Sequence, residues 1–194
     1  MKKILTVLDI DETLVYATSS PKDDHWDFEV HHYRVYKRPY LTEFLEGLMK
    51  DFRVAVWSSA SDDYVDEIVK KIFPIDYPLE FVWGRSRCTY RIDYHQMELT
   101  GYHDAYKHYH YVKRLSKLKR SRNEQLEKVL IIDDTPRKAI YNYGNVIYPK
   151  EFIGDSNDDE LYWLGKYLDT LKDVENVRTI EKRGWKEKMM NQKG

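Results

Sequence analysis

The chain has 194 residues, 42% of them hydrophobic, and its 32 basic and 33 acidic side chains leave a formal net charge of −1. This length suffices for one domain with a substantial core, and the balanced charge argues against nucleic acid or an anionic membrane as an obligatory partner. A single cysteine, Cys88, excludes an internal disulfide framework and a cysteine-rich metal site. The N-terminal apolar run is too short for a signal peptide or a membrane span, so we expect a soluble, intracellular protein.

Five short runs, rich in β-branched residues and nearly free of polar alternation, predict strands. In chain order they lie at residues 4–8, 54–57, 81–83, 129–132 and 146–148. Continuous apolar runs of this length are typical of parallel strands that are covered on both faces. We therefore expect a sheet with helices packed against each side.

Three amphipathic segments predict helices between the strands, at residues 41–48, 65–72 and 161–171. The first follows Pro39, which suits a first helical turn, and the second ends before Pro74. Alternating strands and helices predict a doubly wound α/β domain with a mainly parallel sheet and helices on both faces. The charged last residues, 181–194, predict a frayed terminal helix.

Acidic and hydroxyl side chains follow three of the predicted strands. Asp9 and Asp11 come after the first strand, Ser58 after the second, and Asp133 and Asp134 after residues 129–132. Because ligands of open α/β sheets bind beyond the carboxyl ends of the strands, we expect these side chains to converge on one rim. Carboxylates clustered so closely need a cation, and hard oxygen ligands favour Mg²⁺.

The sequence at these positions resembles a known superfamily. Residues 9–13, DIDET, match the D-x-D-x-T signature of haloacid-dehalogenase-superfamily phosphatases, and Ser58, Lys113 and Asp133-Asp134 follow in the order of that superfamily's further motifs. More narrowly, five segments resemble the NLI-interacting-factor-like family of small C-terminal-domain phosphatases, which act on phosphoserine in RNA polymerase II. These segments are LDIDETLV, KRPYLTEFL, VWSSAS, YVKRLSKL and VLIIDDTP.

The resemblance implies a domain organisation. A Rossmann-like haloacid-dehalogenase-type domain would occupy residues 1–175, with a flap-like segment at about 16–37. A charged helix or tail would follow at 176–194.

The resemblance also implies roles for the acids. Asp9 would be the nucleophile, and Asp11 would act first as general acid and then as general base. Asp9, Asp134 and the backbone carbonyl of Asp11 would bind Mg²⁺, with Asp133 in a supporting place.

Four further residues would handle the phosphoryl group, by the same resemblance. Ser58 and Lys113 would be catalytic and would also bind phosphate, together with Thr13 and Ser59. Phosphoryl transfer leaves a protein mostly positioning and charge neutralisation to perform, which suits hydroxyl and ammonium groups.

Residues 90–111 depart from the family because this segment is longer than its counterpart. It holds six of the 17 tyrosines and four of the seven histidines. His103, His108 and His110 could form a zinc site, but we favour packing of tyrosines against the sheet with histidines outside. A lip that contacts substrate is the third possibility. The segment is too short for an independent cap, so we expect no large cap domain and an open site.

Three functions remain open from the sequence. The first is a Mg²⁺-dependent phosphatase acting on phosphoserine or phosphothreonine in a protein, and the second is the same chemistry on a small metabolite or a nucleic-acid end. The third, a non-catalytic binding module, ranks last because the motif residues are intact. The basic run at 113–122 favours a solvated helix face over a nucleic-acid patch. We expect a monomer without membrane or nucleic-acid partners, in the cytoplasm, or in the nucleus of a eukaryote.

Overall fold

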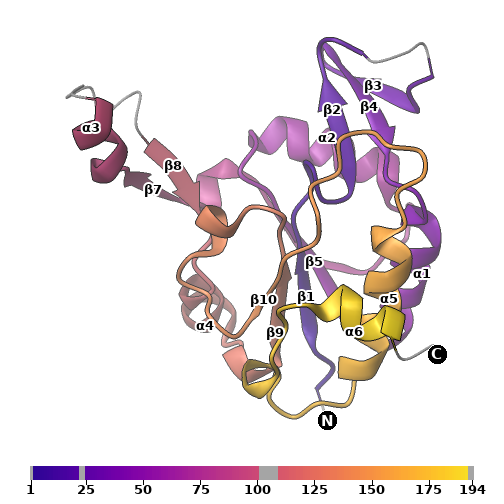
Figure 1. Cartoon of the computed structure of the whole chain (residues 1–194), viewed down its shortest axis with the longest axis vertical. Helices are drawn as coiled ribbons and strands as arrows, with labels where there is room; N and C mark the ends of the chain where they lie inside the picture. Colours follow the sequence, from indigo (N-terminus) through magenta and orange to yellow (C-terminus); the bar gives the residue numbers. More distant parts are fainter. Residues whose placement is uncertain (1, 22–24, 101–108, 192–194) are drawn as a thin grey trace.

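The computed structural model describes residues 2–21, 25–100 and 109–191. A five-stranded parallel sheet in the order β10-β9-β1-β5-β6 forms its centre (Figure 1). The strands are β1 (Leu5–Leu8), β5 (Arg53–Trp57), β6 (Leu79–Trp83), β9 (Val129–Ile132) and β10 (Val146–Ile147). Each corresponds to a run predicted from the sequence, and the parallel pairing with β1 in the middle confirms the doubly wound α/β fold.

Helices cover both faces of this sheet. Along β1, Leu8 faces one hydrophobic cluster, whereas Leu5 and Val7 face another. The helices are α1 (Leu41–Asp51), α2 (Asp62–Ile72), α3 (Tyr94–Thr100), α4 (Ser116–Arg122), α5 (Glu160–Leu171) and α6 (Trp185–Asn191). The first cluster contains side chains of α1, α2 and α5, and the second contains Leu118 of α4, so α4 lies across the sheet from α1 and α5 (Figure 1).

The predicted helices at 41–48, 65–72 and 161–171 are all present, with one difference at the first. Tyr40 has a φ of 63°, in the left-handed region, and α1 begins only at Leu41. Pro39 therefore lies before the helix and not in its first turn. No helix in the described part of the chain is long and apolar enough to cross a membrane.

The segment predicted as a flap forms a small antiparallel sheet in the order β2-β4-β3, from β2 (Val15–Thr18), β3 (Phe28–Val30) and β4 (Tyr33–Lys37). It rises beyond the carboxyl end of β1 (Figure 1). Arg38, just after β4, is fully buried and forms an ion pair with Asp158 through Nε at 2.7 Å. Its Nη1 also donates to the Thr13 carbonyl at 3.0 Å, which fixes the base of the flap to the loop after β1.

The tyrosine- and histidine-rich segment contributes an arm, which we define as β7 (Thr89–Ile92), α3 and β8 (Tyr109–Val112). β7 and β8 pair antiparallel, and the arm projects from the body (Figure 1). The ring of Tyr90 stacks on that of Tyr109 at 5.0 Å, and Tyr111 lies 5.6 Å from Tyr109. Strand alternation places His110 on the opposite face.

The predicted packing of these tyrosines against the central sheet is correct for one of them. Tyr111 packs against the second hydrophobic cluster. Tyr90 and Tyr109 are 47% and 43% exposed because the ribbon extends away from the sheet, so the prediction is wrong for these two. His103 and His108 of the alternative zinc site lie outside the described residues.

The predicted terminal helix is present as α6, but its prediction as frayed is wrong, because Trp185 packs against the domain. Trp185 of α6 is buried, stacks on Tyr167 of α5 at 5.7 Å, and donates its indole N–H to the Tyr148 carbonyl at 3.1 Å. Lys186 forms ion pairs with Asp159 and Glu160 at 2.6 and 2.7 Å. One buried tryptophan thus fixes an otherwise charged helix.

We expect Trp185→Ala to lower the free energy of unfolding by about 3 kcal/mol, the usual range for truncating a buried aromatic residue. Urea unfolding followed by circular dichroism measures this. Met190→Ala is the matched control, because Met190 is on the same helix but 50% exposed, and it should change stability by less than about 0.5 kcal/mol. A loss below about 1 kcal/mol for Trp185→Ala would contradict the packed arrangement.

Candidate active site

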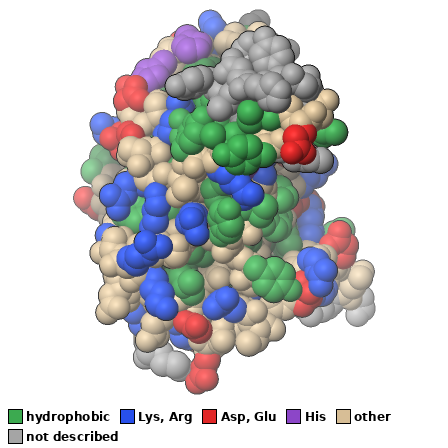
Figure 2. All heavy atoms as spheres, turned by 90° about the vertical axis from the view of Figure 1, so that its left-hand side faces the viewer, with side chains coloured by type: hydrophobic (Ala, Val, Ile, Leu, Met, Phe, Trp, Pro, Cys, Tyr) green, Lys and Arg blue, Asp and Glu red, His purple; other side chains and the backbone are tan. Residues whose placement is uncertain are grey.

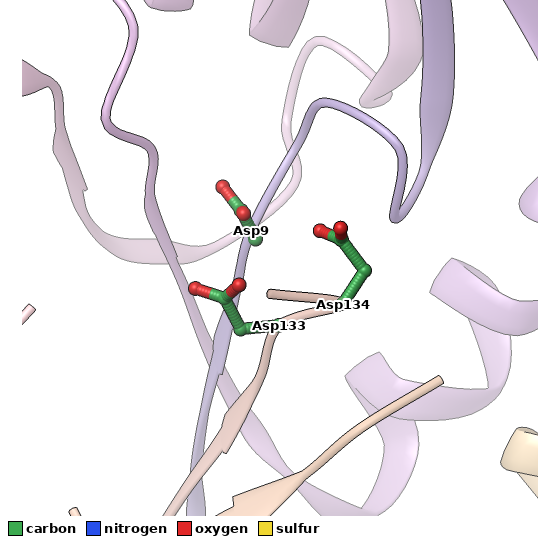
Figure 3. Close-up of side chains that lie close together, drawn as sticks. All are labelled: Asp9, Asp133 and Asp134. Atoms are coloured by element: carbon green, nitrogen blue, oxygen red, sulfur yellow. The ribbon is translucent and has the colours of Figure 1, made fainter. Parts of the chain in front are cut away.

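Three carboxylates meet beyond the carboxyl ends of two neighbouring strands (Figure 3). Asp9 follows β1, and Asp133 and Asp134 follow β9. These strands pair in parallel with Leu8 opposite Ile132, so their next residues are adjacent. One oxygen from each carboxylate lies within 4.8 Å of the other two. The structure thus brings together the acids that the sequence placed at strand ends.

Lys113 lies between two of these carboxylates. Its side chain is fully buried, and its Nζ is 2.7 Å from both Asp9 Oδ1 and Asp133 Oδ2. Burial opposes the charged ammonium, but the charges of Asp133 and Asp9 raise the pKa of Lys113 above its usual value. Conversely, burial and the charge of Asp9 raise the pKa of Asp133 to about 6, although Lys113 opposes this shift.

Lys138, which the sequence reasoning missed, is a second ammonium at this site. It lies in the short helix η3 (Pro136–Ala139), with Nζ 3.1 Å from Asp9 Oδ2 and 4.0 Å from Asp134 Oδ1. Burial opposes its charge, but the nearby carboxylates, Asp9 foremost, raise the pKa of Lys138. The sequence feature that could have identified Lys138 is its position, as a basic residue four positions after Asp134, in the turn that follows a strand.

Asp9 and Asp11 have opposite electrostatic environments. Burial opposes ionisation of Asp9, but Lys113, Lys138 and the Ile10 amide, which donates to Oδ1 at 2.9 Å, hold the pKa of Asp9 below its usual value. Burial raises the pKa of Asp11, and the charge of Asp9 adds to this shift, against a hydrogen bond from Tyr64. The site therefore favours ionisation of Asp9 over ionisation of Asp11.

Two hydroxyl groups hold the Asp11 side chain. The phenol of Tyr64 donates to Asp11 Oδ1 at 2.7 Å, and the hydroxyl of Ser58 donates to Oδ2 at 3.4 Å. Ser58 follows β5 and Tyr64 is in the first turn of α2, so one strand-to-helix segment orients this acid. Tyr64 was not predicted, since its place among 17 tyrosines carries no signal without the fold.

Thr13 contacts the predicted metal ligand Asp134. Its hydroxyl donates to Asp134 Oδ1 at 3.1 Å, and the hydroxyl of Thr135 donates to Oδ2 at 2.8 Å. The Thr135 amide donates to Asp133 Oδ1 at 2.9 Å. Thr13 thus orients a carboxylate here, and its contact with phosphate stays a prediction.

The donors at this site fit a hard divalent cation. Asp9 and Asp134 each present a carboxylate, and Asp11 follows closely enough in the chain to add its backbone carbonyl. Asp133 is already engaged by Lys113 and the Thr135 amide, which suits the supporting place predicted for it. An all-oxygen set of this kind favours Mg²⁺ over softer metals.

The neighbours of Ser58 complete the rim. Ser59 is half-buried, and its carbonyl accepts a hydrogen bond from Arg85 Nε at 2.9 Å. Cys88 is buried, with Sγ 3.6 Å from the Ser58 carbonyl, and burial raises the pKa of its thiol. A raised pKa disfavours the thiolate, which argues against a nucleophilic role for Cys88.

Comparisons with known proteins point to one family. A family model described as NLI interacting factor-like phosphatase matches residues 4–178. The chain is 31% identical to CTD small phosphatase-like protein 2 of Dictyostelium discoideum, over 91% of this chain and 29% of that protein. It is 27% identical to the human carboxy-terminal domain RNA polymerase II polypeptide A small phosphatase 1, over 92% of this chain and 63% of that protein.

Two further matches concern length and fold. The putative CTD phosphatase-like protein 355R of Invertebrate iridescent virus 3 is 29% identical, over 88% of this chain and 98% of that protein. Fcp1, an essential RNA polymerase II CTD phosphatase, superimposes with a TM-score of 0.64 at 14% identity, over 91% of this chain and 69% of that structure. At this identity the superposition supports the fold alone. The chain spans less than two thirds of the length of the Dictyostelium and human relatives.

Lys113→Met should lower the free energy of unfolding by about 3–5 kcal/mol at pH 8, because it leaves buried carboxylates without their partner. Lys113 lowers the pKa of Asp133, so its removal places the folded-state pKa of Asp133 further above the unfolded value, and stability falls as pH rises. The loss should therefore be smaller at pH 5, below the pKa of about 6 that Asp133 has even with Lys113 present. Urea unfolding in EDTA at both pH values measures the difference.

Lys119→Met is the control for that experiment, since Lys119 is exposed on α4 and loses the same charge. It should change stability little at either pH. A loss in Lys113→Met that does not depend on pH would show that Lys113 contributes packing and not charge.

Proposed function

The chain belongs to the NLI interacting factor-like phosphatase family, as its motifs predicted, and on this basis we propose that it hydrolyses phosphomonoesters through an aspartyl-phosphate at Asp9. One observation carries the proposal: two acids of the same loop have opposite environments. Asp9 is held between two ammonium groups, and Asp11 is buried beside hydroxyl groups. A nucleophile and a general acid need this difference at the same pH.

In the first step, a carboxylate oxygen of Asp9 attacks phosphorus and the ester P–O bond breaks. Asp11 gives its proton to the departing oxygen, so the leaving group departs as an alcohol. Lys113 offsets charge on the phosphoryl oxygens, and the Ser58 hydroxyl turns from its 3.4 Å contact with Asp11 to donate to one of them. The product is an acyl phosphate on Asp9.

In the second step, Asp11 is a carboxylate and takes a proton from water. The water oxygen attacks phosphorus, the bond to Asp9 breaks, and inorganic phosphate leaves. This restores the carboxylate of Asp9 and the proton of Asp11. Tyr64 keeps Asp11 in place for both transfers through its 2.7 Å hydrogen bond.

We assign Mg²⁺ to Asp9, Asp134 and the Asp11 backbone carbonyl, where it would neutralise charge on the phosphoryl group. Two threonine hydroxyls already orient Asp134, one from each side of its carboxylate. Lys113 and the Thr135 amide keep Asp133 engaged beside it.

As substrate we propose phosphoserine or phosphothreonine in a segment of a protein chain. No separate domain covers the rim within residues 2–21, 25–100 and 109–191. A chain of contacts connects the rim to the arm: Arg85 donates to the Ser59 carbonyl, and its guanidinium lies 5.2 Å from the ring centre of Tyr111. The tyrosine face of the arm thus continues outward from the loop that holds Ser58.

The surface on this side suits an extended peptide. Figure 2, viewed from the side to which the arm projects, shows exposed hydrophobic side chains interspersed with lysine and arginine side chains. Hydrophobic contacts beside positive charge complement a phosphorylated segment of mixed composition.

The alternatives have less support. A small-metabolite phosphatase would more commonly enclose its substrate and exclude water, and a non-catalytic module would not need the paired Asp9 and Asp11. In the basic run, Lys117 donates to backbone carbonyls and Arg122 pairs with Glu80, which supports a structural over a nucleic-acid-binding role. A monomeric, intracellular protein stays a prediction.

Asp9→Asn should abolish turnover of an aryl phosphate, because an amide cannot attack phosphorus. Asp11→Asn should slow it by about 10² to 10⁴. Since a good leaving group needs little proton transfer, Asp11→Asn should still form the phosphoenzyme but hydrolyse it slowly. Mass spectrometry after acid quenching should therefore find phosphate on Asp9 in Asp11→Asn and none in Asp9→Asn. Turnover by Asp9→Asn at the wild-type rate would refute the mechanism.

A double substitution, Tyr90→Ser with Tyr109→Ser, tests the proposed substrate class. It should lower kcat/KM for a phosphoserine peptide about tenfold, because it removes the exposed aromatic face, and leave aryl phosphate hydrolysis unchanged. Tyr143→Ser, at a position 88% exposed and outside the arm, is the control. If both substrates are affected equally, the arm is structural. If a metabolite outcompetes every phosphopeptide, the small-molecule alternative is correct.

A further inference from the structure

Lys138 occupies the region in which the proposed metal site must form. We propose that its ammonium and Mg²⁺ compete for Asp9 and Asp134, so that Lys138 sets the concentration at which the metal binds. The inference rests on the proposed function, which identifies these two carboxylates as metal ligands.

The distances define the competition. Lys138 Nζ lies 3.1 Å from Asp9 Oδ2 and 4.0 Å from Asp134 Oδ1, so it approaches one oxygen of each ligand. Mg²⁺ binds oxygen at about 2.0–2.1 Å in a near-octahedral shell and needs the same oxygens. A divalent cation and an ammonium this close would repel each other strongly in a mostly buried site. Binding of the metal therefore requires the Lys138 side chain to move.

Lys138, and not Lys113, is the side chain able to move. Lys113 is wholly buried and makes two ion pairs at 2.7 Å, whereas the Lys138 side chain is 17% exposed and its shortest ion pair is 3.1 Å. The backbone of Lys138 is fixed, because its carbonyl accepts the Lys113 amide at 2.7 Å. Only the flexible four-carbon stem has to change rotamer.

The arrangement has a functional consequence. Before the metal binds, Lys138 offsets the negative charge of Asp9 and Asp134, which stabilises carboxylates that would otherwise repel. Mg²⁺ must displace Lys138 from these two carboxylates. The protein therefore binds Mg²⁺ less tightly than the same ligands would bind it without Lys138. The displaced ammonium stays tethered to η3, close to the phosphoryl group that Asp9 attacks.

Lys138→Met tests the competition through metal binding itself. Isothermal titration of the purified protein with MgCl₂ should give a Kd at least about tenfold lower for Lys138→Met than for the wild type. Thermal unfolding is an independent readout. In EDTA the variant should have a lower Tm than the wild type, because Asp9 loses a partner, and added Mg²⁺ should raise its Tm by more.

Three variants separate competition from other effects. Arg137→Met removes the same charge from the neighbouring, exposed position of η3 and should keep the wild-type Kd. Lys138→Arg keeps the charge and should bind Mg²⁺ no more tightly than the wild type. Asp134→Ala should lose Mg²⁺ binding, since it removes a ligand.

Each contrary result overturns the inference. An unchanged or higher Kd in Lys138→Met would show that Lys138 does not compete for the ligands. If Arg137→Met gains as much affinity for Mg²⁺ as Lys138→Met, the effect comes from the loss of any nearby positive charge and not from competition for the ligands. If no variant binds Mg²⁺, the competition and the metal assignment are both wrong. Phosphoenzyme formation on Asp9 tests the proposed reaction separately. Failure of the competition between Lys138 and Mg²⁺ can therefore be distinguished from failure of the proposed reaction.

Discussion

A lysine ammonium buried between two aspartates is the interaction on which this site depends. Lys113 contacts Asp9 and Asp133 at 2.7 Å each, and the three residues directly follow three different strands, β8, β1 and β9. Removing Lys113 would leave buried carboxylate charge uncompensated, which is among the most destabilising changes in a protein interior. The sheet and the base of the arm must therefore assemble together, and their assembly brings the nucleophile and its counter-ion into contact.

The same electrostatics make two neighbouring carboxyl groups chemically different. Lys113 and Lys138 surround Asp9, whereas Asp11 points toward Tyr64 and Ser58 on the other side of the loop. The two ammonium groups hold Asp9 as a carboxylate, whereas burial and the charge of Asp9 raise the pKa of Asp11, against the hydrogen bond from Tyr64. The short spacing of the motif keeps both acids within reach of one phosphoryl group. Their different neighbours suit one acid to nucleophilic attack and the other to proton transfer.

Much of this arrangement could be predicted from the sequence, because covered parallel strands are continuous apolar runs and the chemistry follows at their ends. Asp9, Ser58 and Asp134 could be placed on one rim for that reason. Lys138 was missed, since its one signal was its position four residues after Asp134, and the sequence does not show that η3 turns it toward Asp9. The packing of Trp185 could not be predicted from the sequence either, because a charged segment with one aromatic residue resembles a solvated tail until its partner on α5 is known.

The stereochemistry at phosphorus tests the central claim most directly. A phosphorothioate monoester made chiral at phosphorus with two oxygen isotopes is hydrolysed in water enriched in the third isotope, and the configuration of the inorganic thiophosphate is determined. Transfer first to Asp9 and then to water comprises two in-line displacements, each of which inverts phosphorus. The account predicts net retention of configuration. Net inversion would show that water attacks the substrate in a single step, and it would contradict the role of Asp9 as a covalent nucleophile.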